Sequence, residues 1–149
     1  MTKKQLITIG RTDIIDLPEL DLTNIECKID TGADTSSIHC HRVQIKEKDG
    51  NEYLTFKLLD PKHPDYQKKD YEIYNFKERR VRSSNGQLQY RYVIKTTVIL
   101  FNKKIKAEFT LTDRGKMKYP ILIGRKLLNK NFVVDVSKLN LSFKSKQKK

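Results

Sequence analysis

The sequence predicts an all-β domain with a closed or nearly closed sheet, on three observations. Apolar residues recur in short runs or at every second position, which is the spacing of strands with one buried face. The pairs Asp49-Gly50 and Asn85-Gly86 favour hairpin turns, because Asn, Asp and Gly tolerate the positive φ angles of tight turns. A helix is indicated only once, over residues 124–130.

Strands are expected at residues 25–29, 53–58, 92–101, 105–111 and 120–123. Most of them alternate apolar and polar residues, whereas 92–101 is rich in β-branched and aromatic residues. Residues 60–78 contain two of the four prolines and predict a long inserted loop. The basic residues 144–149 predict a flexible tail. At 149 residues, the whole chain (1–149) is expected to form a single domain.

The composition narrows the class of protein. Lys and Arg number 31 and Asp and Glu 18, so the formal net charge is +13. This surplus favours a polyanionic partner, although a lysine-rich solubilising surface would also produce it. No apolar stretch approaches the ~20 residues of a membrane span, and the first residues lack the ~7–15 apolar residues of a signal peptide. A cytoplasmic protein without a membrane partner is expected, with Cys27 and Cys40 reduced.

Two short segments carry the chemical information. In the first, an apolar strand ends at Asp30 and small residues then turn the chain, so that a carboxylate can lie at the floor of a cleft among backbone N–H groups. In the second, the apolar strand 120–123 breaks at Gly124 into a helix that opens with Arg125.

Together these segments resemble a retropepsin-type aspartic protease. The wider pattern is similar to one bacterial and archaeal family of that fold, which carries the name ATP-dependent zinc protease and is associated with ATP-grasp glutamate ligases of the ribosomal-modification type. The resemblance covers about residues 7–136. It is carried by Ile9-Gly10-Arg11, Leu17-Pro18-Glu19-Leu20, Lys28-Ile-Asp-Thr-Gly-Ala33, Thr35-Ser-Ser-Ile-His39, Arg80–Gly86, Arg91–Ile94, Leu111–Arg114 and Met117–Leu128.

The resemblance implies a closed acid-protease barrel with one short helix near the C-terminus. It also implies an aspartic endopeptidase whose catalytic residues are Asp30, Thr31 and Gly32. That chemistry needs two carboxyl groups, one acting as a base for water while the other, protonated, polarises the scissile carbonyl. The sequence contains one Asp-Thr-Gly, so a homodimer with one Asp30 from each subunit is expected.

Supporting roles follow from the same resemblance. Thr31 would bond across the dimer axis, and Gly32 would let the backbone approach the substrate. Asp34 would form a bidentate ion pair with Arg125, beside Gly124. Ala33 stands where pepsin-like enzymes carry a serine.

A flap over the site is expected from the hairpin around residues 79–91. Its flap and substrate-binding residues would be Arg80, Arg82, Ser83, Ser84, Asn85, Gly86 and Arg91. Because arginine prefers carboxylates, this hairpin would suit an acidic peptide substrate, and the glutamate-ligase association of the resembling family implies a Glu-rich one. A solvated charged hairpin is the alternative.

The residues themselves predict no cofactor and no metal. There is no glycine-rich phosphate cradle followed by Lys-Ser or Lys-Thr, and no pair of histidines one helical turn apart with a Glu between them. The cluster His39-Cys40-His41 would point its neighbours to opposite faces of a strand.

Two other functions remain open at this point. A retropepsin-fold binding module could recognise an acidic protein tail without cutting it, with Asp30 only as a structural element at the dimer axis. Nucleic-acid binding is a further alternative, because Tyr66, Tyr71, Tyr74 and Phe76 alternate with lysines and could stack on bases. No helix-turn-helix, zinc-finger or RNP pattern accompanies these aromatic residues.

Overall fold

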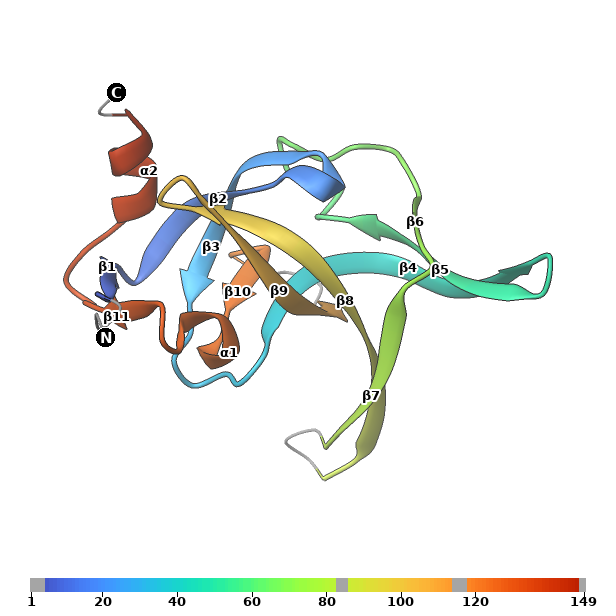
Figure 1. Ribbon diagram of the computed structural model, residues 1–149. Coiled ribbons are helices and arrows are strands. Elements are labelled where there is room, and N and C mark those ends of the chain that lie inside the picture. Colours follow the sequence, from blue (N-terminus) through green and yellow to red (C-terminus); the bar gives the residue numbers. More distant parts are fainter. Residues whose placement is uncertain (1–4, 83–85, 114–117, 148–149) are drawn as a thin grey trace.

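The computed structural model describes residues 5–82, 86–113 and 118–147, and these residues confirm the all-β class (Figure 1). The elements in chain order are β1 (Ile7–Ile9), β2 (Thr12–Leu17), a 3₁₀ turn (Pro18–Leu20), β3 (Leu22–Ile29), β4 (Ser36–Lys48), β5 (Asn51–Leu58), β6 (Tyr71–Ile73), β7 (Phe76–Arg82), β8 (Leu88–Leu100), β9 (Lys103–Thr112), β10 (Ile121–Ile123), α1 (Arg125–Leu128), β11 (Phe132–Val134) and α2 (Leu141–Gln147).

The main sheet closes on itself through β10. Its strand order is β10-β3-β2-β8-β9-β4-β5-β6, and β10 pairs both with β3, in parallel, and with β4, antiparallel. All three residues of β10 are buried, as a strand enclosed by neighbours on both edges requires. The barrel expected from the resemblance is therefore present.

The core lies inside this ring. Alternating residues of the strands point inward, and among the largest fully buried side chains are Ile25, Ile38, Phe56, Ile94 and Phe109. Cys27 and Cys40 are also buried, and both are free thiols.

Two hairpins extend from the barrel. At the β4–β5 turn Asp49 and Gly50 both have positive φ, of 52° and 80°, as the sequence predicts. The second hairpin joins β7 to β8, with Arg82 opposite Leu88 in the pairing register, and Gly86 has φ of 83°. Figure 1 shows β7 and β8 leading away from the barrel on the side where the β3–β4 loop lies.

The structure corrects two expectations about irregular segments. The loop predicted over 60–78 is shorter, because residues 71–73 form β6 against β5 and β7 begins at Phe76. The tail predicted over 144–149 is helical up to Gln147, as part of α2. The buried carboxylate of Asp13 accepts hydrogen bonds from the backbone N–H groups of Ser142 (3.0 Å) and Phe143 (3.1 Å), which holds the start of this second helix on β2.

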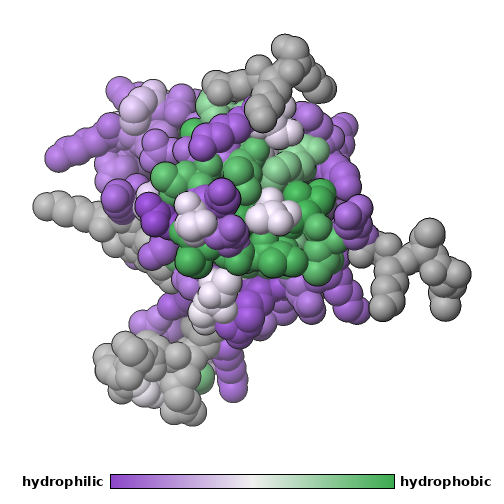
Figure 2. Space-filling view, turned by 90° about the vertical axis from the view of Figure 1, so that its left-hand side faces the viewer, coloured by the Kyte–Doolittle hydropathy of each residue, from purple (hydrophilic) through white to green (hydrophobic). Residues whose placement is uncertain are grey.

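One face of the molecule is apolar. Beside the barrel, β1 and β11 pair in parallel as a separate two-stranded sheet. Figure 2 shows apolar side chains gathered on the side of the molecule where β1 and β11 lie. Exposed apolar residues of these strands and the adjoining segments are Leu6, Val133, Val136 and Leu139. Within the described ranges, no helix has the length and apolar character that crossing a membrane would require.

Candidate active site

The turn after β3 is held by backbone hydrogen bonds to the strand that closes the barrel. Asp30 N–H donates to the carbonyl of Ile123 at 2.8 Å, and Ala33 N–H donates to the carbonyl of Asp30 at 3.3 Å. We call residues 30–34 the catalytic turn, after the role that the resemblance implies for Asp30. Because it continues directly from β3, its first residue is placed by the sheet and not by a free loop.

The first residues of α1, which follow β10, also hold this turn. Arg125 N–H donates to the carbonyl of Ala33 at 2.8 Å, and Lys126 N–H donates to the carbonyl of Asp34 at 3.0 Å. The guanidinium of Arg125 adds a hydrogen bond of 3.0 Å to the carbonyl of Thr31. The two segments that the sequence singles out are therefore in direct contact.

Close packing, and not backbone conformation, requires a glycine at position 124. Its φ of −99° is accessible to any residue. A Cβ at this position would lie 2.7 Å from the carbonyl carbon of Thr35 and 2.9 Å from the carbonyl oxygen of Ala33. Its own N–H donates to the buried hydroxyl of Ser36 at 3.0 Å. The glycine thus lets the turn lie against the start of α1.

The expected bidentate ion pair between Asp34 and Arg125 is not formed. Their nearest charged atoms, Arg125 Nη2 and Asp34 Oδ1, are 4.0 Å apart, and more than half of each side chain is exposed. The guanidinium is instead directed to the Thr31 carbonyl. The backbone hydrogen bonds from Arg125 and Lys126 hold the turn against α1, which is the role that the resemblance implies for the charge pair.

The Asp30 carboxylate is half-buried and partly satisfied. Its Oδ1 accepts the N–H of Gly32 at 3.0 Å, and a Cβ on Gly32 would lie 3.3 Å from that oxygen. In the described part of the chain no hydrogen bond reaches Oδ2. Thr31 and Gly32 are exposed. One carboxylate oxygen is thus fixed by the backbone, while the other is open to a water molecule or a second carboxyl group.

The β7–β8 hairpin separates its arginines between two faces. Arg80 is exposed and lies over the ring of Tyr90, 5.5 Å from its centroid. Arg91 is half-buried and pairs opposite Arg79. Arg79 donates a hydrogen bond of 3.4 Å to the Thr35 hydroxyl. The base of the hairpin therefore touches the residue that follows the catalytic turn.

The remaining residues of the predicted flap are described only in part. Gly86 is exposed. Ser83, Ser84 and Asn85 lie outside the described residues, and so does the side chain of Arg82.

The histidines and cysteines do not fit a zinc site. No group of three or more His, Cys, Asp or Glu side chains able to hold a metal ion occurs among residues 5–82, 86–113 and 118–147. His39 is buried, whereas His41 stacks on Tyr66 with ring centroids 5.9 Å apart. Burial raises the pKa of Cys40 to about 12, so its thiol is not a thiolate nucleophile near neutral pH.

Sequence reasoning missed two residues that bond to segments next to the catalytic turn. Ser36 accepts the Gly124 N–H, and Arg79 bonds the Thr35 hydroxyl across 44 positions of sequence. Neighbouring residues of a strand point to opposite faces, so Arg79 points to the face of β7 away from Arg80. This alternation is the sequence signal that could have identified Arg79.

Comparison with known proteins adds a family and several relatives. The family model for RimB-like proteins, described as "Retropepsin-like aspartic endopeptidase RimB", matches residues 8–145. A protein of Shewanella halifaxensis named "Probable alpha-L-glutamate ligase" is 32% identical over 133 residues, which are 87% of this chain and 28% of that protein. A protein of the same name from Parasynechococcus marenigrum is 31% identical, over 91% of this chain and 28% of its own length.

A solved structure shares the fold. The Legionella pneumophila protein Lpg0085, described as of unknown function (DUF785), superposes with a TM-score of 0.70 at 25% sequence identity. The match covers 93% of this chain and 99% of the Legionella chain. By contrast, the chain spans little more than a quarter of the length of the ligase-named relatives.

Proposed function

Because the chain belongs to the RimB-like family of retropepsin-like aspartic endopeptidases, we propose that it is an aspartic peptidase acting as a homodimer. The observation that carries the proposal is how Asp30 is held and which of its carboxylate oxygens is bonded. Its backbone is fixed by the closing strand β10, and its carboxylate has one oxygen bonded to Gly32 N–H and the other without a partner in the described chain. This is a preorganised carboxylate that is open to reactants.

The reaction needs two such groups. In the proposed dimer, Asp30 of one subunit is ionised and takes a proton from water as its oxygen attacks the peptide carbonyl. Asp30 of the other subunit is protonated and donates to the carbonyl oxygen. The C–N bond then breaks as the first Asp30 gives its proton to the amine nitrogen, while the second takes a proton from a hydroxyl of the tetrahedral intermediate. The products are the amine and the carboxylic acid, and the pair again holds one proton. Two carboxyl groups about 3 Å apart share one proton because both cannot ionise.

The surface beside the turn supports association with a second copy. A cleft of about 600 Å³ is lined both by Thr31 and Asp34 of the turn and by apolar residues Leu6, Leu128 and Phe132. It adjoins the apolar face of β1 and β11 (Figure 2). Exposed apolar patches of this kind mark association surfaces. A second copy on this face would bring its own turn towards Asp30.

An acidic, Glu-rich peptide is the proposed substrate class. The net charge of +13 favours anionic ligands. Arg79, Arg80 and Arg91 lie on the hairpin whose base touches Thr35. The relatives named glutamate ligase contain a segment similar to this chain, which links the fold to proteins concerned with glutamate.

One observation favours the binding-module alternative. The bond from Gly32 N–H to the Asp30 carboxylate is also the bond of an Asx turn, which a purely structural aspartate makes. In that case the chain would bind an acidic tail without cutting it.

Peptide cleavage by wild type and Asp30→Asn tests the proposal. Poly-glutamate and mixed acidic peptides are the substrates, with a glutamine peptide of equal length as control. We expect kcat/KM for the acidic peptides to fall at least about a thousandfold in Asp30→Asn. Equal cleavage by both proteins would contradict the assignment. Binding without cleavage, unchanged by the substitution, would favour the binding module.

A further inference from the structure

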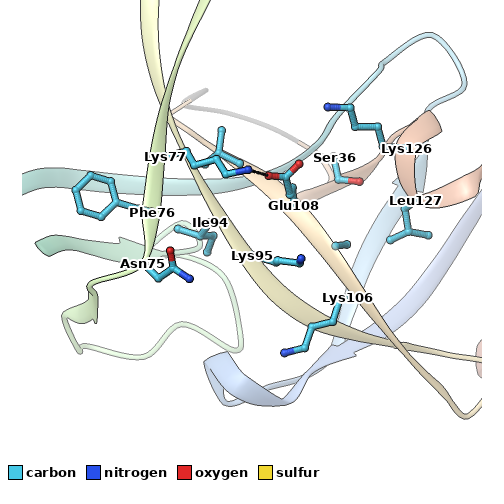
Figure 3. Close-up of a pocket in the computed structure, with 12 residues that line it drawn as sticks. Ser36, Asn75, Phe76, Lys77, Ile94, Lys95, Lys106, Glu108, Lys126 and Leu127 are labelled. Carbon is cyan, nitrogen blue, oxygen red and sulfur yellow. Dashed lines mark hydrogen bonds and ion pairs between the residues drawn. The ribbon is translucent and has the colours of Figure 1, made fainter.

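A second cleft, of about 480 Å³, lies on the outer face of the β8–β9 pair (Figure 3). β8 and β9 form its floor, β7 one wall and α1 the other. Four lysines line it: Lys77 from β7, Lys95 from β8, Lys106 from β9 and Lys126 from α1. The carboxylate among its lining residues is that of Glu108. We call it the lysine cleft.

The lysine cleft begins where the catalytic turn ends. Ser36 lines it, two residues after Asp34, and its hydroxyl accepts the Gly124 N–H. Lys126 lines it as well, and its N–H donates to the Asp34 carbonyl. An extended peptide advances about 3.3 Å per residue, so a chain lying across the turn reaches this cleft within a few residues.

Two of the four lysines are already paired. Lys77 Nζ lies 3.2 Å from the Glu108 carboxylate, and Lys106 Nζ lies 3.0 Å from that of Glu19. The ion pairs of the described residues do not include Lys95 or Lys126. These two exposed side chains come from different parts of the cleft, Lys95 from its floor and Lys126 from its α1 wall, and Lys95 stands opposite Glu108 in the β8–β9 register.

The carboxylate of Glu108 shows that the cleft stabilises a negative charge. The hydrogen bond from Lys77 lowers the pKa of Glu108, and the charges of Lys77, Arg79 and Lys126 lower it further. The local potential therefore favours an ionised carboxyl group. A substrate carboxylate placed next to it would meet Lys95 and Lys126, which form no ion pair within the described residues.

We propose that the lysine cleft is a carboxylate subsite for residues several positions from the cut bond, with Lys95 and Lys126 as its specificity-determining residues. The inference rests on the proposed function for its orientation, since it extends the acidic substrate beyond the catalytic turn. The two specificity-determining residues lie outside the arginine hairpin of residues 79–91, although β7 forms one wall of the cleft.

Binding to the inactive Asp30→Asn protein tests the subsite without turnover. The probes are hexaglutamate and hexaglutamine peptides. In this background, Lys95→Gln/Lys126→Gln is compared with Lys46→Gln/Lys48→Gln, which removes the same charge from the exposed β4–β5 hairpin. We expect the cleft pair to weaken hexaglutamate binding about threefold to tenfold and the control pair to weaken it less than twofold. Hexaglutamine binding should be equal in both.

The outcomes separate the two proposals. Equal hexaglutamate affinity in the two lysine variants would overturn the subsite, even if the wild-type chain cuts the peptide. A larger loss in the cleft variant would support the subsite, even if the wild-type chain leaves the peptide uncut, and the peptidase proposal alone would then fail. A loss that is equally large for hexaglutamine would also overturn the subsite, because it would show disrupted packing and not lost charge recognition.

Discussion

Asp13 and Asp30 are two aspartates on neighbouring strands with opposite surroundings. Asp13 pairs opposite Cys27, three residues before Asp30. The Asp13 side chain is completely buried and accepts backbone N–H groups from Ile14, Ser142 and Phe143. Asp30 is half-buried, and its carboxylate accepts only the N–H of Gly32 within the described residues.

The difference separates a structural carboxylate from a reactive one. Two of the three hydrogen bonds that the Asp13 carboxylate accepts come from α2 and hold that helix on β2, and burial leaves no path for a substrate. Asp30 keeps an oxygen without a partner at an exposed turn, although its backbone is equally well anchored. A strand-end carboxylate with a fixed backbone and an unsatisfied oxygen is the stronger candidate for chemistry.

The largest expected effect on stability comes from removing the structural aspartate. Asp13→Ala leaves the N–H groups of Ser142 and Phe143 buried without an acceptor, so the free energy of unfolding should fall by about 3 kcal/mol. Asp30→Ala should change it by less than about 1 kcal/mol. Urea unfolding of the two variants at pH 7 measures both. A larger loss in Asp30→Ala would reverse the comparison.

Close packing at Gly124 predicts the next effect. The added methyl group of Gly124→Ala meets the backbone of Thr35 and Ala33, and should cost about 2 kcal/mol while displacing the catalytic turn. Gly50→Ala is the control, because φ is 80° there but nothing lies within 4 Å, and it should cost about 1 kcal/mol with unchanged peptidase activity. Full activity in Gly124→Ala would show that the turn tolerates displacement.

Arg125 distinguishes a hydrogen bond from an ion pair. Arg125→Ala removes the bond to the Thr31 carbonyl and should lower the free energy of unfolding by about 1 kcal/mol. Asp34→Asn removes only the 4.0 Å contact and should change it by less than about 0.5 kcal/mol. Thermal unfolding compares them. An equal loss of unfolding free energy in the two variants would show that the ion pair implied by the resemblance contributes as much as the hydrogen bond.

The smallest effect is a pH dependence at Asp13. Burial raises the pKa of this carboxyl above 3.8, despite the backbone N–H groups that lower it. The folded state then holds the proton more tightly than the unfolded state. The resulting stabilisation is complete below pH 3.8 and is lost as the pH rises through the raised pKa. Wild type should therefore lose stability relative to Asp13→Asn over that interval in parallel urea titrations. A difference in unfolding free energy between the two proteins that does not change with pH would contradict the raised pKa of Asp13.

The parts of the site that are local in sequence could be predicted from it. Asp30 and its turn, and Gly124 with Arg125, each lie within one short segment whose residue types suit a strand end, a tight approach and a helix start. The hairpin at Asp49-Gly50 was predictable for the same reason.

What depends on contacts between distant segments could not be predicted. The burial of Asp13 follows from α2, which lies about 130 residues further along and whose lysines resemble a solvated tail. The partners of Arg125 depend on a small difference in distance, since its guanidinium lies 3.0 Å from the Thr31 carbonyl and 4.0 Å from the Asp34 carboxylate. The four lysines of the lysine cleft come from four separate elements, β7, β8, β9 and α1.

Mixing wild type with Asp30→Asn tests the central claim most directly, that one site takes Asp30 from each of two chains. Wild-type protein at constant concentration is equilibrated with increasing Asp30→Asn, and hydrolysis of an acidic peptide is measured. If only wild-type pairs are active and chains pair at random, activity should fall to about half at equal concentrations and to about a tenth at a ninefold excess of the variant. Activity that stays constant at every ratio would show that each chain works alone, and would contradict the shared site.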